Sequence, residues 1–357
     1  MIVKNVIPIL KLMKKTSLII CVLVMAALIP FASLEAASKA KKKQIGIATY
    51  SVKGLESDIE GSLKALADYG YTVMEISNYN AGRGTVAGYS PADYAALAEK
   101  YGLDIISSHA RAKFDVKDIP GSLEAWGKLF DDHKIMGCKY VVFPMNTWSS
   151  DLDALKAECN LMNLIGAEAG KRGLKFGYHN HSMEFATVPG TSLTFEDFLI
   201  QNTDPDKVFF QMDVYWITIG GMDPVTYLKK YPDRFSVLHI KDDYVIGESG
   251  KIDYKAIFKQ FYKNGHKDWF VEMEAKMTDE QRKQSIAMME MMKQRMSGAQ
   301  QGPPQGAPQG QAGQRQGQQA GAGFGQRDPQ AQAAMLKESL DGIRLSAEYL
   351  KNAKFVK

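Results

Sequence analysis

Eight short apolar runs constrain the fold of this chain more than any other feature. They recur about every thirty residues, and each is followed by a loop and an amphipathic helical stretch. Several of them lack polar alternation, which is typical of strands that a parallel sheet buries on both faces. The runs are Ile45–Thr49, Thr72–Ile76, Asp104–Ser107, Tyr140–Phe143, Lys175–Tyr178, Val208–Met212, Ser236–Ile240 and Trp269–Met273.

Helix signals lie between these runs. Ser90-Pro91 and Asp223-Pro224 each place a capping side chain before a proline at the first helical position. Glycines follow several expected helices, where a residue after the last turn often needs a positive φ. Eight successive strand–helix units of similar length favour a closed (β/α)8 TIM barrel, an α/β fold, over the alternative of a doubly wound open sheet.

The N-terminal residues 1–40 have the pattern of a secretory signal peptide. Lys14 and Lys15 precede an apolar run that begins at Leu18, and small residues such as Ala36 and Ala37 follow it. A permanent membrane anchor is the alternative interpretation. We therefore expect an exported, periplasmic protein that meets the membrane only through this segment during export.

A segment of unusual composition interrupts the C-terminal part of the chain. Residues 297–329 are dominated by Gln, Gly, Ala and Pro and cannot bury enough apolar surface to become ordered. We interpret them as an insertion in the last βα loop, between a barrel of residues 41–296 and a final barrel helix of residues 330–357. Just before the insertion, residues 279–296 form a Met-rich helical stretch, which we attribute to packing.

Charge and cysteine content exclude some classes of protein. The formal net charge is only +4, and no basic stripe or nucleic-acid motif is present, so we expect no nucleic-acid partner. Beyond the predicted signal peptide, Cys138 and Cys159 remain. Two cysteines do not form a disulfide framework, and we expect both to be buried apolar residues.

Imidazoles and carboxylates gather where the predicted strands end. His109, His179, His181 and His239 lie at or just after such ends, which in a barrel face one shared mouth. Asp213, His239 and Glu272 stand near the ends of three successive strands, and Glu75, Glu184 and Glu274 also fall on this side. Oxygen and imidazole ligands without a thiolate suit one divalent metal ion, namely Mn, Mg, Co or Zn.

Aromatic residues also follow the strands on the mouth side. Trp148, Phe185 and Trp216 come after the fourth, fifth and sixth predicted strands. These rings could stack on a sugar, or they could pack in the core. The sequence leaves both options open.

Four segments, namely Tyr178–Phe185, Gln211–Asp213, Leu238–Asp242 and Trp269–Glu272, carry a resemblance to a known superfamily. The chain resembles the xylose-isomerase-like TIM-barrel superfamily, also called the sugar phosphate isomerase/epimerase group. That resemblance implies a divalent metal held by Glu, Asp, His and Glu on strands five to eight, and Asp213, His239 and Glu272 occupy the last three positions. The first position departs from this pattern, because His179 stands where many epimerases carry Glu, and the His-Asn-His arrangement is similar to inosose-dehydratase-like branches. His179 can still bind the metal, and Glu184 in the following loop is the alternative ligand.

The resemblance implies chemistry through an enediolate. A metal chelates a carbonyl and an adjacent hydroxyl of a sugar, and a base removes a neighbouring proton. Glu184, His179 and His181 are the candidate bases. Lys241 is an acid or an oxyanion-stabilising group, or else forms a salt bridge with a neighbouring aspartate. His109 binds substrate or serves as a second acid–base group.

Our first hypothesis is a metal-dependent sugar isomerase/epimerase-type enzyme that acts on a neutral small carbohydrate, since phosphorylated sugars are mostly intracellular. The runner-up is a lyase or dehydratase that eliminates water or an aglycone from a keto-sugar or 3-keto-glycoside. A non-catalytic carbohydrate-binding barrel is the third hypothesis. Assembly into a homo-oligomer is left open.

Overall fold

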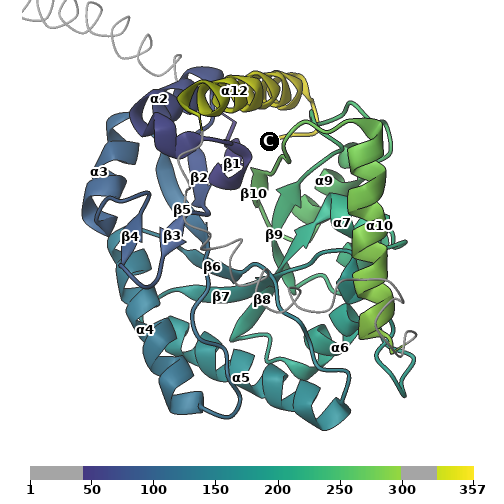
Figure 1. Cartoon of the computed structure of the whole chain (residues 1–357). Coiled ribbons are helices and arrows are strands. Elements are labelled where there is room, and N and C mark those ends of the chain that lie inside the picture. The colour runs from purple at the N-terminus through teal and green to yellow at the C-terminus, as the bar shows by residue number, and fades with distance from the viewer. Residues whose placement is uncertain (1–42, 299–327) are drawn as a thin grey trace, which may run out of the picture. The chain divides into compact units, whose positions relative to one another are not determined.

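The computed structural model describes residues 43–298 and 328–357. Eight parallel strands close into a barrel in which β1 pairs with β2 on one side and with β10 on the other (Figure 1). The predicted (β/α)8 barrel is confirmed, and the open sheet is excluded. The strands are β1 (Gly46–Ala48), β2 (Val73–Ile76), β5 (Asp104–His109), β6 (Tyr140–Phe143), β7 (Lys175–His179), β8 (Val208–Asp213), β9 (Phe235–Ile240) and β10 (Asp268–Val271).

One helix follows each strand and covers the outside of the barrel. Ser90 and Asp223 cap their helices ahead of a proline, as the sequence predicts. These helices are α2 (Ile59–Tyr69), α3 (Pro91–Lys100), α4 (Ile119–Ile135), α5 (Leu152–Gly170), α6 (Phe195–Asn202), α8 (Pro224–Lys230), α9 (Tyr254–Lys263) and α12 (Pro329–Asn352).

Further elements lie in the loops. The helices α7 (Val214–Ile219) and α10 (Asp279–Met296) follow β8 and β10. Three 3-10 turns are η1 (Thr49–Ser51), η2 (Leu55–Ser57) and η3 (Met183–Phe185). An antiparallel hairpin of β3 (Tyr79–Asn80) and β4 (Thr85–Val86) was not predicted, because two-residue strands show no alternation.

The barrel interior is filled with side chains below its mouth. Inward-facing apolar residues from seven strands form a separate cluster, which leaves the polar inward positions at the C-terminal strand ends. The members of this cluster are Ala48, Val73, Ile106, Tyr140, Val142, Phe209, Val237 and Phe270.

The helices α5 and α12 each pack closely against a part of the barrel that is distant in sequence. A Cβ added at Gly166 in α5 would lie 2.2 Å from the backbone oxygen of Lys207, just before β8. The helix α12 returns to the start of the barrel, where the Tyr71 hydroxyl donates to the Ile343 carbonyl over 2.9 Å. It thereby takes the place of the eighth outer helix beside α2.

Some sequence predictions fall beyond the described part of the chain. The signal peptide of residues 1–40 and almost all of the insertion at 297–329 lie outside the described residues. Within the residues that are described, no helix combines the length and apolar character needed to cross a membrane. Cys138 and Cys159 are both buried and free, as predicted.

Candidate active site

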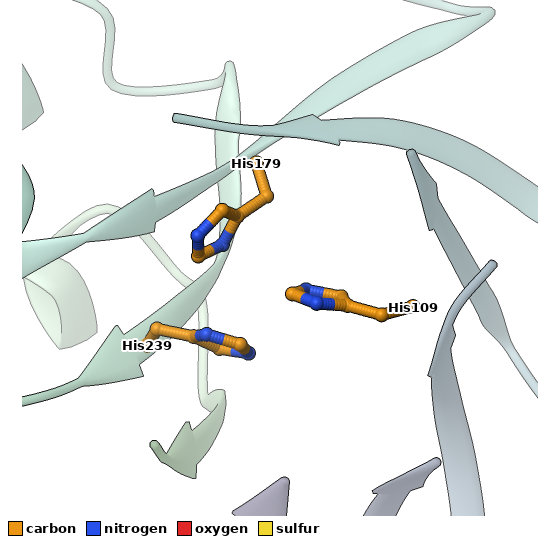
Figure 2. Close-up of side chains that lie close together, drawn as sticks. All are labelled: His109, His179 and His239. Carbon is orange, nitrogen blue, oxygen red and sulfur yellow. The ribbon is translucent and has the colours of Figure 1, made fainter. Parts of the chain in front are cut away.

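Four neighbouring strand ends bring together the residues predicted to bind metal. His179 ends β7, Asp213 ends β8, His239 lies in β9, and Glu272 directly follows β10. Their potential ligand atoms all lie within 4.8 Å of one another, and all four side chains are buried. Figure 2 shows the rings of His179 and His239 converging with that of His109 on one point of the barrel.

The geometry of this four-residue group fits a divalent cation. Nδ1 of His239 lies 3.0 Å from Oε2 of Glu272, without the alignment of a hydrogen bond. Two donor atoms about 2.1 Å from one ion, at a right angle, would be separated by about 3.0 Å. Within the described residues, Oδ2 of Asp213 also has no hydrogen-bond partner although it is buried. Buried polar atoms without partners are rare, so these atoms fit a shared ion.

Asp213 uses its two carboxylate oxygens for different purposes. Oδ1 accepts hydrogen bonds from the backbone amides of Tyr215 at 2.9 Å and Trp216 at 2.8 Å, which caps α7. Oδ2 is left facing Nε2 of His179, 4.0 Å away. The backbone amide of Asp213 donates to the side chain of Asn180, the middle residue of His-Asn-His. The helix cap therefore fixes the carboxylate that the ion would need.

Two residues beneath this group orient its imidazole rings. Glu75 lies 2.6 Å from Nε2 of His239, and its other oxygen accepts from Nε2 of Gln211 at 2.8 Å. The Gln211 amide oxygen in turn accepts from Nδ1 of His179 at 3.0 Å and from Nε2 of His109 at 2.6 Å. Each ring thus has one nitrogen occupied by the protein, and His179 and His239 keep the other nitrogen for a ligand.

The pKa values of the two histidines in the group are shifted in opposite directions. Burial lowers the pKa of His179 well below its usual value. Burial alone would also lower the pKa of His239, but the carboxylates of Glu75 and Glu272 raise it to about 10. Because only an unprotonated nitrogen binds metal, a proton and a cation compete for His239.

Lys241 lies at the mouth, next to the candidate metal-binding group of His179, Asp213, His239 and Glu272. Its Nζ is 2.7 Å from Oε1 of Glu272 and 2.6 Å from Oε1 of Glu274, and 5.0 Å from the centre of the Trp216 ring. Burial alone would lower the pKa of Lys241, but the two glutamates raise it well above its usual value. Lys241 is therefore a protonated group that can donate, and its partners are these glutamates rather than the neighbouring aspartates.

His181 and Trp216 form a polar wall beside the rings of the group. Their ring centres are 5.8 Å apart, and that of His181 lies 4.9 Å from that of His179. Among the described residues, neither Nδ1 of His181 nor Nε1 of Trp216 has a hydrogen-bond partner, although both atoms are buried. Burial lowers the pKa of His181 to about 3, so its ring is neutral. Hydroxyl groups of a sugar would satisfy both atoms.

His109 belongs to the inner layer as well. Its ring stacks on that of His239 with centres 4.8 Å apart, and its Nε2 lies 3.2 Å from Glu75. Together with His179 and His239 it forms a second group of residues that could hold an ion. The predicted role of His109 in binding substrate remains a prediction.

Three predicted site residues lie elsewhere, behind β7. Tyr178 alternates with His179 and packs on the helix side, where Glu184 accepts its hydroxyl hydrogen bond at 2.6 Å. The second oxygen of Glu184 accepts from the backbone amide of His181, because η3 turns the chain back beneath the strand end. The indole of Trp148 donates to the Tyr178 hydroxyl, and Phe185 packs edge-on against Tyr227. The structure thus places all three in the packing layer.

No supporting role was predicted for Glu75 and Gln211, the residues that orient the imidazole rings. Glu75 was expected near the mouth, and Gln211 lies in a segment already singled out, but neither was assigned a partner. Strand alternation signals that both face inward. Their contacts join residues 136 and 164 positions apart, for which a single sequence holds no signal.

Residues 63–295 match the family described as the xylose isomerase-like TIM barrel, and the chain belongs to it. Enzymes of this family are therefore the appropriate frame for the site.

Three known proteins illustrate the range of similarity. A sugar phosphate isomerase/epimerase from Parabacteroides distasonis is 29% identical, with a TM-score of 0.69 over 90% of this chain and 99% of that one. An inosose dehydratase from Geobacillus kaustophilus is 26% identical over 200 residues, which span 50% of this chain and 60% of the dehydratase. The IOLI protein, solved with a binding zinc atom, shares only the fold, at 16% identity and a TM-score of 0.52 over 72% of this chain and 98% of that one.

Proposed function

We propose that the protein is a metal-dependent enzyme that removes a proton next to the keto group of a small carbohydrate and then eliminates an oxygen substituent. The observation that carries this proposal is the four-residue metal-binding group with the cationic Lys241 directly beside it. The leaving oxygen belongs to a hydroxyl or to a glycosidic bond.

Different residues would bind the metal and remove the proton. His179, Asp213, His239 and Glu272 would hold the ion, which when bound polarises the keto oxygen and stabilises the negative charge that develops on it. His181 offers an unpartnered, neutral ring nitrogen at the mouth and is the group to accept the proton, with the negative charge that develops on the substrate raising its pKa from the value of about 3 set by burial. Glu184 is not assigned this role because Tyr178 and the His181 backbone amide occupy its oxygens.

Lys241 completes the elimination. As the C–H bond breaks, its electrons form a carbon–carbon double bond and the adjacent C–O bond breaks. The leaving oxygen then takes a proton from the Lys241 ammonium group, which is within reach of the ligand Glu272. Glu274 holds the ammonium group from the other side, over 2.6 Å.

The residue at the end of β7, His179, favours elimination over epimerisation. Epimerisation requires an acid–base group on each face of the reacting carbon, and the superfamily resemblance places a glutamate on this strand as one of them. Here His179 stands there, with one nitrogen bonded to Gln211 and the other facing Asp213. The similarity to inosose dehydratases supports the same choice.

Isomerisation or epimerisation is the second candidate function. It is supported by the similarity over nearly the whole length of the Parabacteroides distasonis protein, which is described as a sugar phosphate isomerase/epimerase. Both candidates begin with the same proton removal, so the products distinguish them.

Product analysis tests the proposal directly. The metal-loaded protein is incubated with unphosphorylated keto-sugars and 3-keto-glycosides, chosen because we expect an exported protein, and the products are analysed by liquid chromatography and mass spectrometry. Loss of water or of an aglycone supports elimination, whereas an unchanged mass with a shifted retention time shows isomerisation. No turnover of any compound would favour a carbohydrate-binding protein.

Lys241→Met tests the role of the ammonium group. We expect it to reduce turnover by about 10²- to 10⁴-fold, the usual contribution of an acid–base group, while bound metal is retained. Lys255→Met, on the exposed side of α9, serves as the control and should keep full activity. Full activity of Lys241→Met would show that Lys241 does not donate the proton to the leaving oxygen.

A further inference from the structure

The helix α10 exposes methionines that the fold does not bury. Met288 is 56% exposed and Met291 is 44% exposed, although the surrounding residues are mostly charged or amide side chains. Met289 and Met292 pack against the core, and Met296 is buried. Packing therefore accounts for part of this Met-rich stretch and leaves Met288 and Met291 unexplained.

The spacing of three of these residues places them on one turn of the helix. Met288, Met291 and Met292 stand at positions i, i+3 and i+4, which are surface neighbours with Cβ atoms about 5–6 Å apart. Methionine has three rotatable side-chain bonds and a polarisable thioether, so the three sulfurs can turn toward one point. Met292 is half-buried, which limits the motion of one of them.

The helix itself is held at both ends, which fixes the relative positions of the three residues. Thr278 and Gln281 form a capping box at its start, and Arg282 donates to the Asp243 carbonyl over 2.6 Å. Near its end, Lys293 donates to the Gly220 carbonyl over 3.0 Å. The lysine charge next to Met292 is thus directed toward the barrel loops.

The donor chemistry of this turn differs from that of the barrel mouth. Among the described residues, the His, Cys, Asp and Glu groups able to hold an ion lie at the mouth, and none includes a residue of α10. Neutral thioethers are soft ligands, which select Cu(I) and similar monovalent ions over Mg, Mn or Zn. We propose that Met288, Met291 and Met292 form a surface site for a soft monovalent cation, Cu(I) or Ag(I), independent of the metal at the mouth.

Copper titration of matched variants tests this site. The whole protein, first loaded with zinc at the mouth, is titrated anaerobically with Cu(I) against a chromophoric Cu(I) chelator. We expect the parent protein to take up one Cu(I) equivalent more than the variant Met288→Leu/Met291→Leu/Met292→Leu. Leucine matches methionine in volume and helix propensity, so the fold should persist, which circular dichroism checks. Met335→Leu, a change of another exposed methionine on α12, should retain the extra equivalent.

X-ray absorption at the copper edge identifies the ligands of that equivalent. Cys138 and Cys159 are buried, so sulfur scattering in the parent that disappears in the triple variant must come from the methionines. Equal copper uptake by parent and triple variant, or nitrogen scattering alone, would overturn the proposal. Neither readout depends on enzymatic turnover, so the result is separate from the fate of the proposed elimination.

Discussion

Oε1 of Glu75 lies 2.6 Å from Nε2 of His239, and this pair connects the first half of the barrel to the metal-binding group. The contact leaves Nδ1 of His239 directed at Glu272. Burial alone would raise the pKa of Glu75, but His109 and His239 hold it below its usual value, so Glu75 is a carboxylate. An anion behind a metal-binding imidazole fixes the ring and increases its basicity.

Replacing Glu75 should therefore weaken metal binding without removing a ligand. We expect Glu75→Gln to lower the affinity for zinc or manganese by about 10- to 100-fold, the usual effect of losing such a supporting residue. Calorimetric titration of the apoprotein measures this change. Glu56→Gln, on an exposed turn, provides the control. Unchanged affinity in Glu75→Gln would show that the contact does not support the ion.

Asp213→Asn separates the metal-binding role of this residue from its helix cap. The amide oxygen of asparagine can still accept from Tyr215 and Trp216, but the charged oxygen toward His179 is lost. We expect elemental analysis to find the variant without metal and circular dichroism to find it folded. Asp223→Asn, which changes the capping aspartate of α8, should leave the metal content intact. Full metal content in both Asp213→Asn and His239→Ala would refute the assigned site.

Glu184 should make the stability of the protein depend on pH. Burial raises its pKa from 4.5 to about 7, so the folded protein binds this proton more tightly than the unfolded chain does. Its contribution to stability is present below about 4.5 and falls, by on the order of 3 kcal/mol, as pH rises to about 7.

Glu184→Gln removes this titration. Urea unfolding at several pH values through that window should show a shallower loss of stability in the variant than in the parent protein. Glu56→Gln should follow the parent. Parallel curves for Glu184→Gln and the parent would show that Glu184 is not held as a neutral acid.

Two glycines of α5 give a matched test of the packing of this helix. Gly166→Ala places a Cβ against the Lys207 backbone oxygen, which cannot rotate away, and we expect a loss of about 1–3 kcal/mol in the free energy of unfolding. Gly170→Ala, at the end of the same helix, meets nothing within 4 Å and should be neutral or slightly stabilising. Thermal and urea unfolding measure both, and equal stabilities would contradict the close approach of α5 to β8.

The barrel was predictable because its signals are local. Each predicted apolar run overlaps one strand of the barrel, with ends that differ by at most two residues, and the capping residues Ser90 and Asp223 begin helices where the sequence indicates. Asp213, His239 and Glu272 followed from the same frame, and the family resemblance added His179 to them. Their position at a strand end and the side to which they point depend on a few neighbouring residues and on the shared direction of parallel strands.

Residues in the loops were less predictable, as Glu184 illustrates. Its place is set by the turn η3 and by the hydroxyl of Tyr178, and neither contact leaves a periodic pattern in the sequence. For Trp148 the sequence left sugar stacking and core packing both open, and its indole donates to Tyr178 in the packing layer. Hydrogen bonds of this kind depend on tertiary structure and override the expectation based on proximity to a strand end.

The pairing of β1 with β10 has a consequence for how the molecule forms. Ile47 is the register partner of Val271, and the helix α12 that covers this side comes later still in the chain. The seam of the barrel therefore joins the earliest and latest parts of the sheet, a contact with a high entropic cost of loop closure. In a nascent polypeptide the edges of β1 and β9 that β10 joins therefore stay unpaired until β10 has emerged, so the barrel is an open sheet during most of its synthesis.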